Sequence, residues 1–327
     1  MNQKVLAGVL IIVVLALGMF FYSTSLTGKA TTSEKLKIGI LEHSAGLPYF
    51  VALENKYFEQ ERLNENNVEY ISFTSSKPLG DAIASGSVDA GIISYATIFG
   101  WEARTPGEFI GLLPAGDTLE HGTLPLLVPK DSQVNSIADL KGKKIGIAGP
   151  SVIPFVKVII GRFFDPSQVE LVNVDTTVQV QALATKNLDA LLATEPHATI
   201  ALESGIARVL EPSPRAKYIM NPFPAGPLMT VKLETVKQKR GKVEAAKRAL
   251  ERAIEFIRLN ESSAREIMAK RLKLNQSIAK KAGLYVYYKQ SEVTPEIKQR
   301  VQELAEVTFK ANQTSKLVDT RTLFYSD

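Results

Sequence analysis

One short pattern of strand, small-residue loop and helix occurs twice in this chain. Lys37-Ile38-Gly39-Ile40 recurs 107 residues later as Lys144-Ile145-Gly146-Ile147. The block Ala82 to Ala90 recurs 100 residues later as Ala182 to Ala190. Strands rich in Ile and Ala are common, so one match alone is weak, but two matches in the same order at nearly equal offsets are not. We expect two copies of one small α/β lobe.

The spacing of apolar residues predicts the fold class. From Leu36 onward, short apolar strands alternate with longer helical stretches, which is typical of an α/β protein with mainly parallel sheets. A cluster of turn residues at 221–227 follows the second copy, and the pattern after it is wholly helical. These last helices must cover an earlier lobe. We therefore predict one lobe from 36–127 plus 224–327 and another from 128–223, joined by a two-stranded hinge.

Residues 1–35 carry a different signal. Lys4 precedes an uncharged apolar run from Val5 to Tyr22, which is typical of an export signal or a single membrane anchor. Gly28-Lys29-Ala30 supplies small residues for cleavage after Ala30. Cleavage and an uncleaved anchor both remain open, whereas no cysteine follows the run to carry a lipid. In either case the fold begins near Leu36 and faces outside the cytoplasm, in the periplasm or on the outer face of the cytoplasmic membrane.

Composition excludes several kinds of chemistry. The chain has no cysteine, so disulfides, thiolate metal sites and cysteine nucleophiles are excluded. It has three histidines, which are few for a multi-histidine metal site. The turn with Asp117 and His121 lacks a third metal ligand, and the roles of Arg104 and Arg162 stay open. We expect no metal and no cofactor.

The net charge of +5 is concentrated in one segment. Between Lys232 and Lys281, fifteen Lys and Arg residues stand against six Glu. These charges alternate in sign at helical spacing with few aromatic residues between them, which indicates a solvated helix exterior rather than a nucleic-acid groove. We therefore expect no nucleic-acid partner.

Candidate binding residues lie in loops that follow the predicted strands. In open α/β sheets, ligands bind beyond the carboxyl ends of strands, where hydroxyls and free backbone N–H groups at helix starts can contact them. The loops of this kind are 44–46, 75–76, 94–95, 149–151 and 176–177. Their Ser and Thr residues are equally typical of helix N-caps. Glu195 is expected either to bind the ligand or to tie its own loop by accepting backbone N–H bonds.

Several blocks together resemble a known family. Lys37-Ile38-Gly39-Ile40, Tyr57-Phe58, Asp81 to Gly91, Ser136 to Gly146 and Ala190 to Pro196 resemble the nitrate/sulfonate/taurine-type solute-binding proteins of ABC importers. That group includes binders of thiamine-pyrimidine precursors and has the type II periplasmic binding protein fold. The similarity covers residues 36–210 and continues loosely beyond them.

The resemblance implies a receptor without enzymatic activity. It would close its two lobes on a small solute, such as a sulfonate, nitrate, a carboxylate or a pyrimidine-like compound, and deliver it as a monomer to an ABC permease. The implied ligand-binding residues are Ser44, Gly46, Tyr49, Ser75, Ser76, Ser94, Tyr95, Ser151, Thr176, Thr177 and Glu195. Pro150 departs from the family pattern and removes one N–H donor. Two alternatives stay open: a membrane-anchored ligand-sensing ectodomain, and an enzyme acting through Glu195 and His197.

Overall fold

The computed structural model describes residues 35–324. The chain divides into two units, Met1–Lys35 and Leu36–Asp327, and the fold below is that of the second unit. The expected export signal or anchor at 5–22 lies outside the described residues. Within 35–324, no helix has both the length and the apolar character needed to cross a membrane.

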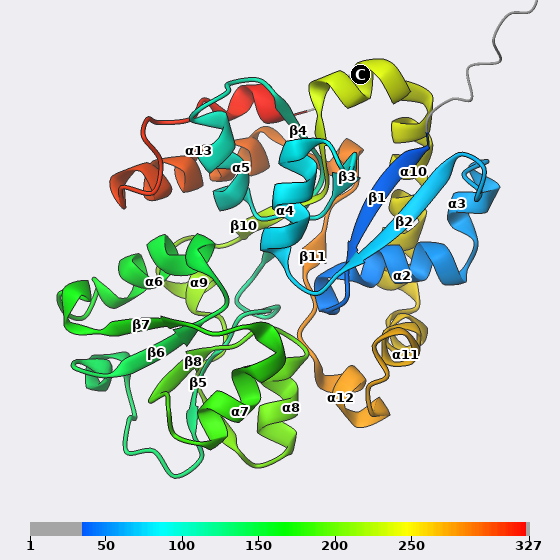
Figure 1. Ribbon diagram of the computed structural model, residues 1–327. Coiled ribbons are helices and arrows are strands. Elements are labelled where there is room, and N and C mark those ends of the chain that lie inside the picture. Colours follow the sequence, from blue (N-terminus) through cyan, green and yellow to red (C-terminus); the bar gives the residue numbers. More distant parts are fainter. Residues whose placement is uncertain (1–34, 325–327) are drawn as a thin grey trace, which may run out of the picture. The chain divides into compact units, whose positions relative to one another are not determined.

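Two sheets organise the unit (Figure 1). The first has the order β11-β4-β10-β3-β1-β2 and the second the order β7-β6-β8-β5-β9. The strands of the first sheet are β1 (Leu36–Leu41), β2 (Val68–Phe73), β3 (Ala90–Gly91), β4 (Phe109–Asp117), β10 (Phe223–Lys232) and β11 (Val286–Tyr287). Those of the second are β5 (Leu126–Pro129), β6 (Lys144–Ile147), β7 (Glu170–Asn173), β8 (Ala190–Leu192) and β9 (Ala207–Glu211). We call residues 36–117 with 223–324 the first lobe and residues 126–211 the second lobe.

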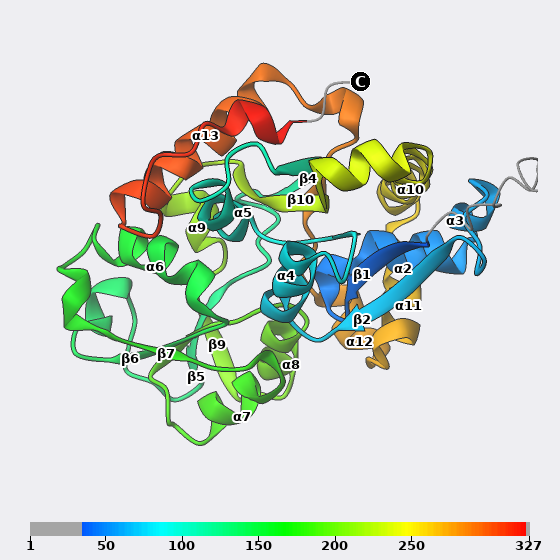
Figure 2. The ribbon, with the colours of Figure 1, turned by 45° about the horizontal axis from the view of Figure 1, so that its top comes forward.

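Helices cover both sheets (Figure 2). The α-helices are α2 (Leu47–Glu54), α3 (Tyr57–Gln60), α4 (Ser76–Ser85), α5 (Tyr95–Glu102), α6 (Ile153–Ile160), α7 (Gln179–Ala184), α8 (His197–Glu203), α9 (Pro214–Tyr218), α10 (Leu233–Leu259), α11 (Glu261–Leu272), α12 (Gln276–Lys281) and α13 (Pro295–Lys310). Short 3-10 helices are η1 (Ser44–Gly46), η2 (Ile137–Leu140), η3 (Pro150–Val152), η4 (Pro166–Gln168), η5 (Thr176–Val178), η6 (Gln290–Glu292) and η7 (Thr320–Leu323).

The predicted internal repeat is confirmed in atomic detail. In both sheets the first strand of the repeat lies between the second and third, with all three parallel. Asp89 accepts the backbone N–H of Lys37 at 2.8 Å, and Asp189 accepts that of Lys144 at 2.9 Å. Equivalent residues of the two copies therefore make the same hydrogen bond.

The chain crosses between the sheets at 118–125 and 212–222. These crossings shift the predicted boundaries slightly. Leu126 and Leu127 pair with β8 and β9 in the second sheet, and Phe223 pairs with Asp117 in the first. The reason is that β5 already starts at Leu126, and β10 starts at Phe223, inside the turn cluster 221–227.

The sequence predicts only helices after the turn cluster 221–227, and this prediction is wrong. β10 passes through the proline-rich segment and pairs with β4, with an irregular register between Pro224 and Gly226. β11 adds an edge strand against β4. Two prolines obscured β10, because proline cannot donate to a sheet and usually indicates a turn.

The last helices pack mainly on the first lobe. An apolar face of α10 is buried at Val243, Leu250 and Ile254, and α10 packs on α2. On α13, Val301 and Leu304 are buried, whereas Phe309 is 40% exposed. α13 also contacts α6 of the second lobe, beside which it lies in both views (Figures 1 and 2).

Candidate ligand-binding site

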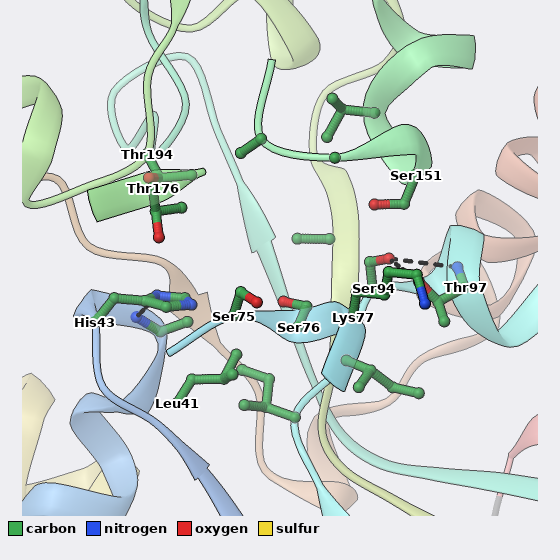
Figure 3. Close-up of a pocket in the computed structure, with 18 of the residues that line it drawn as sticks. Leu41, His43, Ser75, Ser76, Lys77, Ser94, Thr97, Ser151, Thr176 and Thr194 are labelled. Atoms are coloured by element: carbon green, nitrogen blue, oxygen red, sulfur yellow. Dashed lines mark hydrogen bonds between the residues drawn. The ribbon is translucent and has the colours of Figure 1, made fainter. Parts of the chain in front are cut away.

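A pocket of about 560 Å³ lies where loops of the two lobes meet. Segments that directly follow all six parallel strands, β1, β2, β3, β6, β7 and β8, line it. The strand ends meet there because each lobe turns the carboxyl edge of its parallel strands toward the other lobe, the usual place for ligands in such sheets. Figure 3 shows the first-lobe side chains along one side and Ser151, Thr176 and Thr194 on the other.

The first lobe supplies serine hydroxyls at the starts of two helices. Ser75 is the N-cap of α4 but makes no side-chain capping bond, and Ser76 is its first residue. Neither hydroxyl bonds to any residue within 35–324, so both are free to contact a ligand. Ser94, in contrast, caps α5 by accepting from the N–H of Thr97 at 3.3 Å. Its hydroxyl therefore serves the helix, as the capping alternative predicts.

The second lobe supplies Ser151 and Thr176, whose hydroxyls also have no protein partner in the described part of the chain. Ser151 lies in η3 and Thr176 begins η5. Gly149, which precedes η3, has a φ of 103°, a conformation that favours glycine. Thr194 also lines the pocket, and its hydroxyl donates to Oε1 of Gln179 at 3.3 Å.

Three predicted residues are placed in the core instead. Tyr49 is fully buried and donates its hydroxyl to the carbonyl of Leu228 at 2.7 Å. Tyr95 is 1% exposed and stacks on Phe99. A Cβ on Gly46 would lie 2.2 Å from the carbonyl oxygen of Leu41, so its role is close packing. Both tyrosines sit inside helices that bury this face, and burial raises the pKa of each.

Ser44, Glu195 and Thr177 do not line the pocket either. Ser44 donates its hydroxyl to the backbone carbonyl of Glu195 at 2.9 Å and so connects the two lobes. The Glu195 carboxylate accepts from the backbone N–H of Thr199 at 3.2 Å and from its hydroxyl at 3.1 Å. Burial raises the pKa of Glu195, while bonds from Thr199 and the N–H of Gly283 oppose this. Thr177 donates to Asp175.

Of the two roles expected for Glu195, the structure agrees with the second, in which its carboxylate holds its own loop by accepting a backbone N–H bond. The enzyme alternative needs a Glu195 carboxylate that can contact a substrate, whereas this carboxylate accepts two hydrogen bonds from Thr199 near the start of α8. His197, the other residue of that alternative, has a buried Nδ1 without a partner among the described residues, and burial lowers its pKa.

The pocket lining also contains residues that were not among the predicted ligand contacts, including His43 and Arg215, which carry nitrogen donors. His43 precedes η1 and lines the pocket, and burial lowers the pKa of its imidazole to about 4. Its position next to Ser44 in a candidate loop was a usable signal. Arg215 reaches the pocket from α9, far along the chain, and no local pattern indicates this.

The Lys and Arg residues of the pocket wall, Lys77 and Arg215, are each paired with a carboxylate. Arg215 pairs with Asp117, and both side chains are buried. Burial alone would lower the pKa of Arg215, but Asp117 and Tyr285 raise it. Lys77 pairs with Asp81 at 2.6 Å. Asp175 also lines the pocket and accepts from the N–H of Thr177.

The residues left open by the sequence find structural roles. Asp117 is the partner of Arg215, while Arg104 donates to the carbonyl of Gly100 at 3.1 Å. Arg162 donates to the carbonyl of Tyr218. The backbone N–H of His121 donates to the hydroxyl of Thr118. Over residues 35–324, no group of three or more His, Asp or Glu side chains is placed to hold a metal ion.

A family model described as NMT1/THI5 like matches residues 44–264. Among curated proteins, a putative aliphatic sulfonates-binding protein of Escherichia coli (strain K12) is 26% identical over 200 residues, covering 59% of this chain and 60% of that protein. The match therefore spans about three fifths of the relative's length.

Solved structures share the fold. The alkanesulfonate-binding protein SsuA from Xanthomonas axonopodis pv. citri, bound to MOPS, superposes with a TM-score of 0.75 at 16% identity, covering 89% of this chain and 98% of that one. The desulfurization enzyme DSZB superposes with a TM-score of 0.65 at 15% identity, covering 90% and 97%. The expected type II periplasmic binding protein fold is confirmed, and this fold also occurs in an enzyme.

Proposed function

Because the chain belongs to the NMT1/THI5-like family, we propose that it is an extracytoplasmic solute-binding protein of an ABC importer. It would capture a small solute between its two lobes and release it to a membrane permease. The observation that carries this proposal is the pocket between the six parallel strand ends, with free hydroxyls from both lobes. A ligand that bonds to both sides at once stabilises the closed arrangement of the lobes.

We infer that the ligand is a small oxyanion such as a sulfonate, with nitrate, carboxylates and pyrimidines as the further classes to test. The sulfonate is placed first because the curated relative is named for sulfonates and a structural neighbour holds MOPS, itself a sulfonate. Hydroxyls of Ser75, Ser76, Ser151 and Thr176 are suitable donors to oxyanion oxygens.

A ligand screen with a matched pair of variants tests the binding function. A ligand present at a hundred times its Kd stabilises the folded state by about 2.7 kcal/mol, which a thermal-unfolding screen detects. Ser151→Ala is expected to weaken binding of the best ligand, while Ser87→Ala, outside the pocket, leaves it unchanged. Equal affinities in the two variants would contradict the proposed site.

We further propose that the protein acts as a monomer outside the cytoplasm, exported or held at the membrane by residues 5–22. Delivery to a permease is tested by reconstituting the importer in vesicles and measuring its ATPase activity with and without this protein and its ligand. Stimulation by the loaded protein is expected. Ligand binding without any stimulation would favour the sensing-ectodomain alternative.

A further inference from the structure

His43 is the one imidazole that lines the pocket in the described part of the chain. It follows β1 and caps η1, so its backbone and ring are held in place at the end of a buried strand. In Figure 3 the ring lies on the first-lobe side, beside Ser75 and facing Thr176 and Thr194 of the second lobe. Its position allows it to reach a ligand held between the two sets of hydroxyls.

The hydrogen bond at Nδ1 decides which nitrogen faces the ligand. Nδ1 accepts from the backbone N–H of Ala45 at 3.3 Å, so in the neutral ring the proton lies on Nε2. No residue within 35–324 bonds to Nε2, and Nε2 is not among the fully buried unpaired atoms. Nε2–H is therefore an open donor at the pocket wall.

The surroundings of His43 keep the ring uncharged. Burial, together with His197 on α8, lowers its pKa to about 4, and Glu42 acts in the opposite direction. Glu42 is itself held by Arg271 at 2.7 Å and by the hydroxyl of Ser72 at 2.5 Å. Asp175 also lines the pocket, and its negative charge raises the pKa of His197. At neutral pH the ring offers a hydrogen bond without a positive charge.

Among residues 35–324, each Lys or Arg of the pocket wall has a carboxylate partner. Lys77 and Arg215 are each paired with a carboxylate, and Asp175 adds a further negative charge. A ligand with two negative charges would lose its hydration without gaining a compensating charge, which is unfavourable in a closed cleft. A ligand with one charge or none needs only donors, and the wall supplies these.

We propose that His43 is a specificity-determining ligand contact, which donates Nε2–H to an acceptor atom of a ligand carrying at most one negative charge. This inference rests on the proposed binding function and narrows its ligand class. It separates sulfonates, nitrate, monocarboxylates and neutral heterocycles from phosphonates and other dianions.

Two substitutions separate the donor role of His43 from its capping role. In His43→Asn, the side-chain oxygen can accept from the N–H of Ala45, but the side chain is too short to place a donor where Nε2 was. Gln in His43→Gln can place its amide N–H near that position. With propanesulfonate as the probe, we expect about a tenfold loss of affinity in His43→Asn and a loss under about threefold in His43→Gln, measured by calorimetry. A merely structural role predicts that His43→Asn keeps full affinity, and that result would overturn the proposal.

The charge selectivity has its own test. Propylphosphonate matches propanesulfonate in shape but gains a second negative charge as the pH rises through its second ionisation. We expect phosphonate affinity to increase as the pH is lowered from about 8 to about 6, with sulfonate affinity nearly constant. Tighter binding of the phosphonate dianion would overturn the proposal. The protein's own titrating groups are controlled by the sulfonate series.

The ring state is measured without any ligand. The chain has three histidines, so ¹⁵N-histidine NMR of the full protein resolves them, and the signal absent from His43→Asn assigns His43. A neutral ring with the proton on Nε2 at pH 7 is expected, and an imidazolium or an Nδ1–H ring would overturn the proposal. If no member of the sulfonate, nitrate, carboxylate and pyrimidine panel binds the wild type, the binding function itself fails and the inference with it. If the wild type binds but the His43 variants contradict the expected order, only the inference fails.

Discussion

Tyr49 and Ser151 both follow strands with parallel partners, β1 and β6, yet their hydroxyls have different surroundings. Tyr49 donates to the carbonyl of Leu228 inside the first lobe, whereas Ser151 faces the pocket. Tyr49→Phe is expected to lower the free energy of unfolding by about 1–2 kcal/mol, because a buried carbonyl loses its partner, and to leave ligand affinity unchanged. Ser151→Ala should do the reverse. Urea unfolding and calorimetry on both variants check this. Weakened binding in Tyr49→Phe would show that Tyr49 contacts the ligand after all.

Five of the predicted site residues line the pocket: Ser75, Ser76, Ser94, Ser151 and Thr176. The sequence could place them because each comes within a few residues of a strand end. It could not show which way Tyr49, Tyr95 and Glu195 point, since that depends on packing partners distant in the chain. Arg215 was missed for the same reason, because α9 reaches the pocket only after the chain has crossed back between the sheets.

Removing one partner of the Arg215–Asp117 pair is expected to destabilise the protein strongly, whereas replacing both partners by apolar residues should destabilise it less. Asp117→Asn leaves a buried guanidinium without its countercharge, so we expect a loss of about 3–5 kcal/mol in the free energy of unfolding. The double variant Asp117→Leu with Arg215→Met should be less destabilised than Asp117→Asn. The exposed pair Lys77–Asp81 is the control, since removing it should cost under about 1 kcal/mol. Additive single and double effects in chemical denaturation would contradict the coupling.

At the scale of elements, the repeat was readable because the same residues recur with the same spacing. The shared bonds of Asp89 and Asp189 explain the recurrence, since a carboxylate just before the third strand fixes the start of the first. β10 could not be predicted from the sequence, because its prolines are typical of a turn. They fit within the sheet because Phe223 to Pro227 pair with β4 alone, and β3 joins only at Thr230 and Val231.

The two equivalent aspartates are expected to differ in energetic weight. Asp89 also binds Lys239 of α10 at 2.8 Å, with both side chains largely buried. Within residues 35–324, the ion-pair partner of Asp189 is Lys143, at 3.6 Å, and the Asp189 side chain is 39% exposed. We therefore expect Asp89→Ala to cost about 2–3 kcal/mol and Asp189→Ala about 1 kcal/mol in urea unfolding. Equal costs would mean that the bond to α10 contributes little.

At the scale of the whole molecule, the two lobes meet at ties outside the pocket. Ser44 bonds to Glu195, Lys281 pairs with Glu203 at 2.7 Å, and α13 contacts α6. Other basic residues of 232–281 form ion pairs within the first lobe, including Arg248 with Glu61 and Lys270 with Glu54. This agrees with the expected solvated helix exterior, because the cations face carboxylates of neighbouring elements.

The groups beside these ties make the stability of the whole unit depend on pH. The pKa values of His43, which falls from 6.5 to about 4, and of His197 are lowered by burial, so the unfolded state binds their protons more tightly. Their contribution to stability is complete above about pH 6.5 and is lost as the pH falls toward 4. Glu195 acts in the opposite sense, because burial raises its pKa and the folded state holds that proton more tightly.

The free energy of unfolding should therefore fall between about pH 6.5 and pH 4.5, with each proton of difference contributing about 1.4 kcal/mol per pH unit. His43→Asn removes one of the two histidine protons that the unfolded state binds more tightly, and should flatten this dependence. Glu195→Gln removes the offsetting group while keeping an acceptor for Thr199, and should steepen it. Urea unfolding at about pH 7, 6 and 5 measures the three slopes. A slope in His43→Asn equal to that of the wild type would show that His43 is not held neutral by burial, which would also remove the physical basis for an uncharged donor at the ligand.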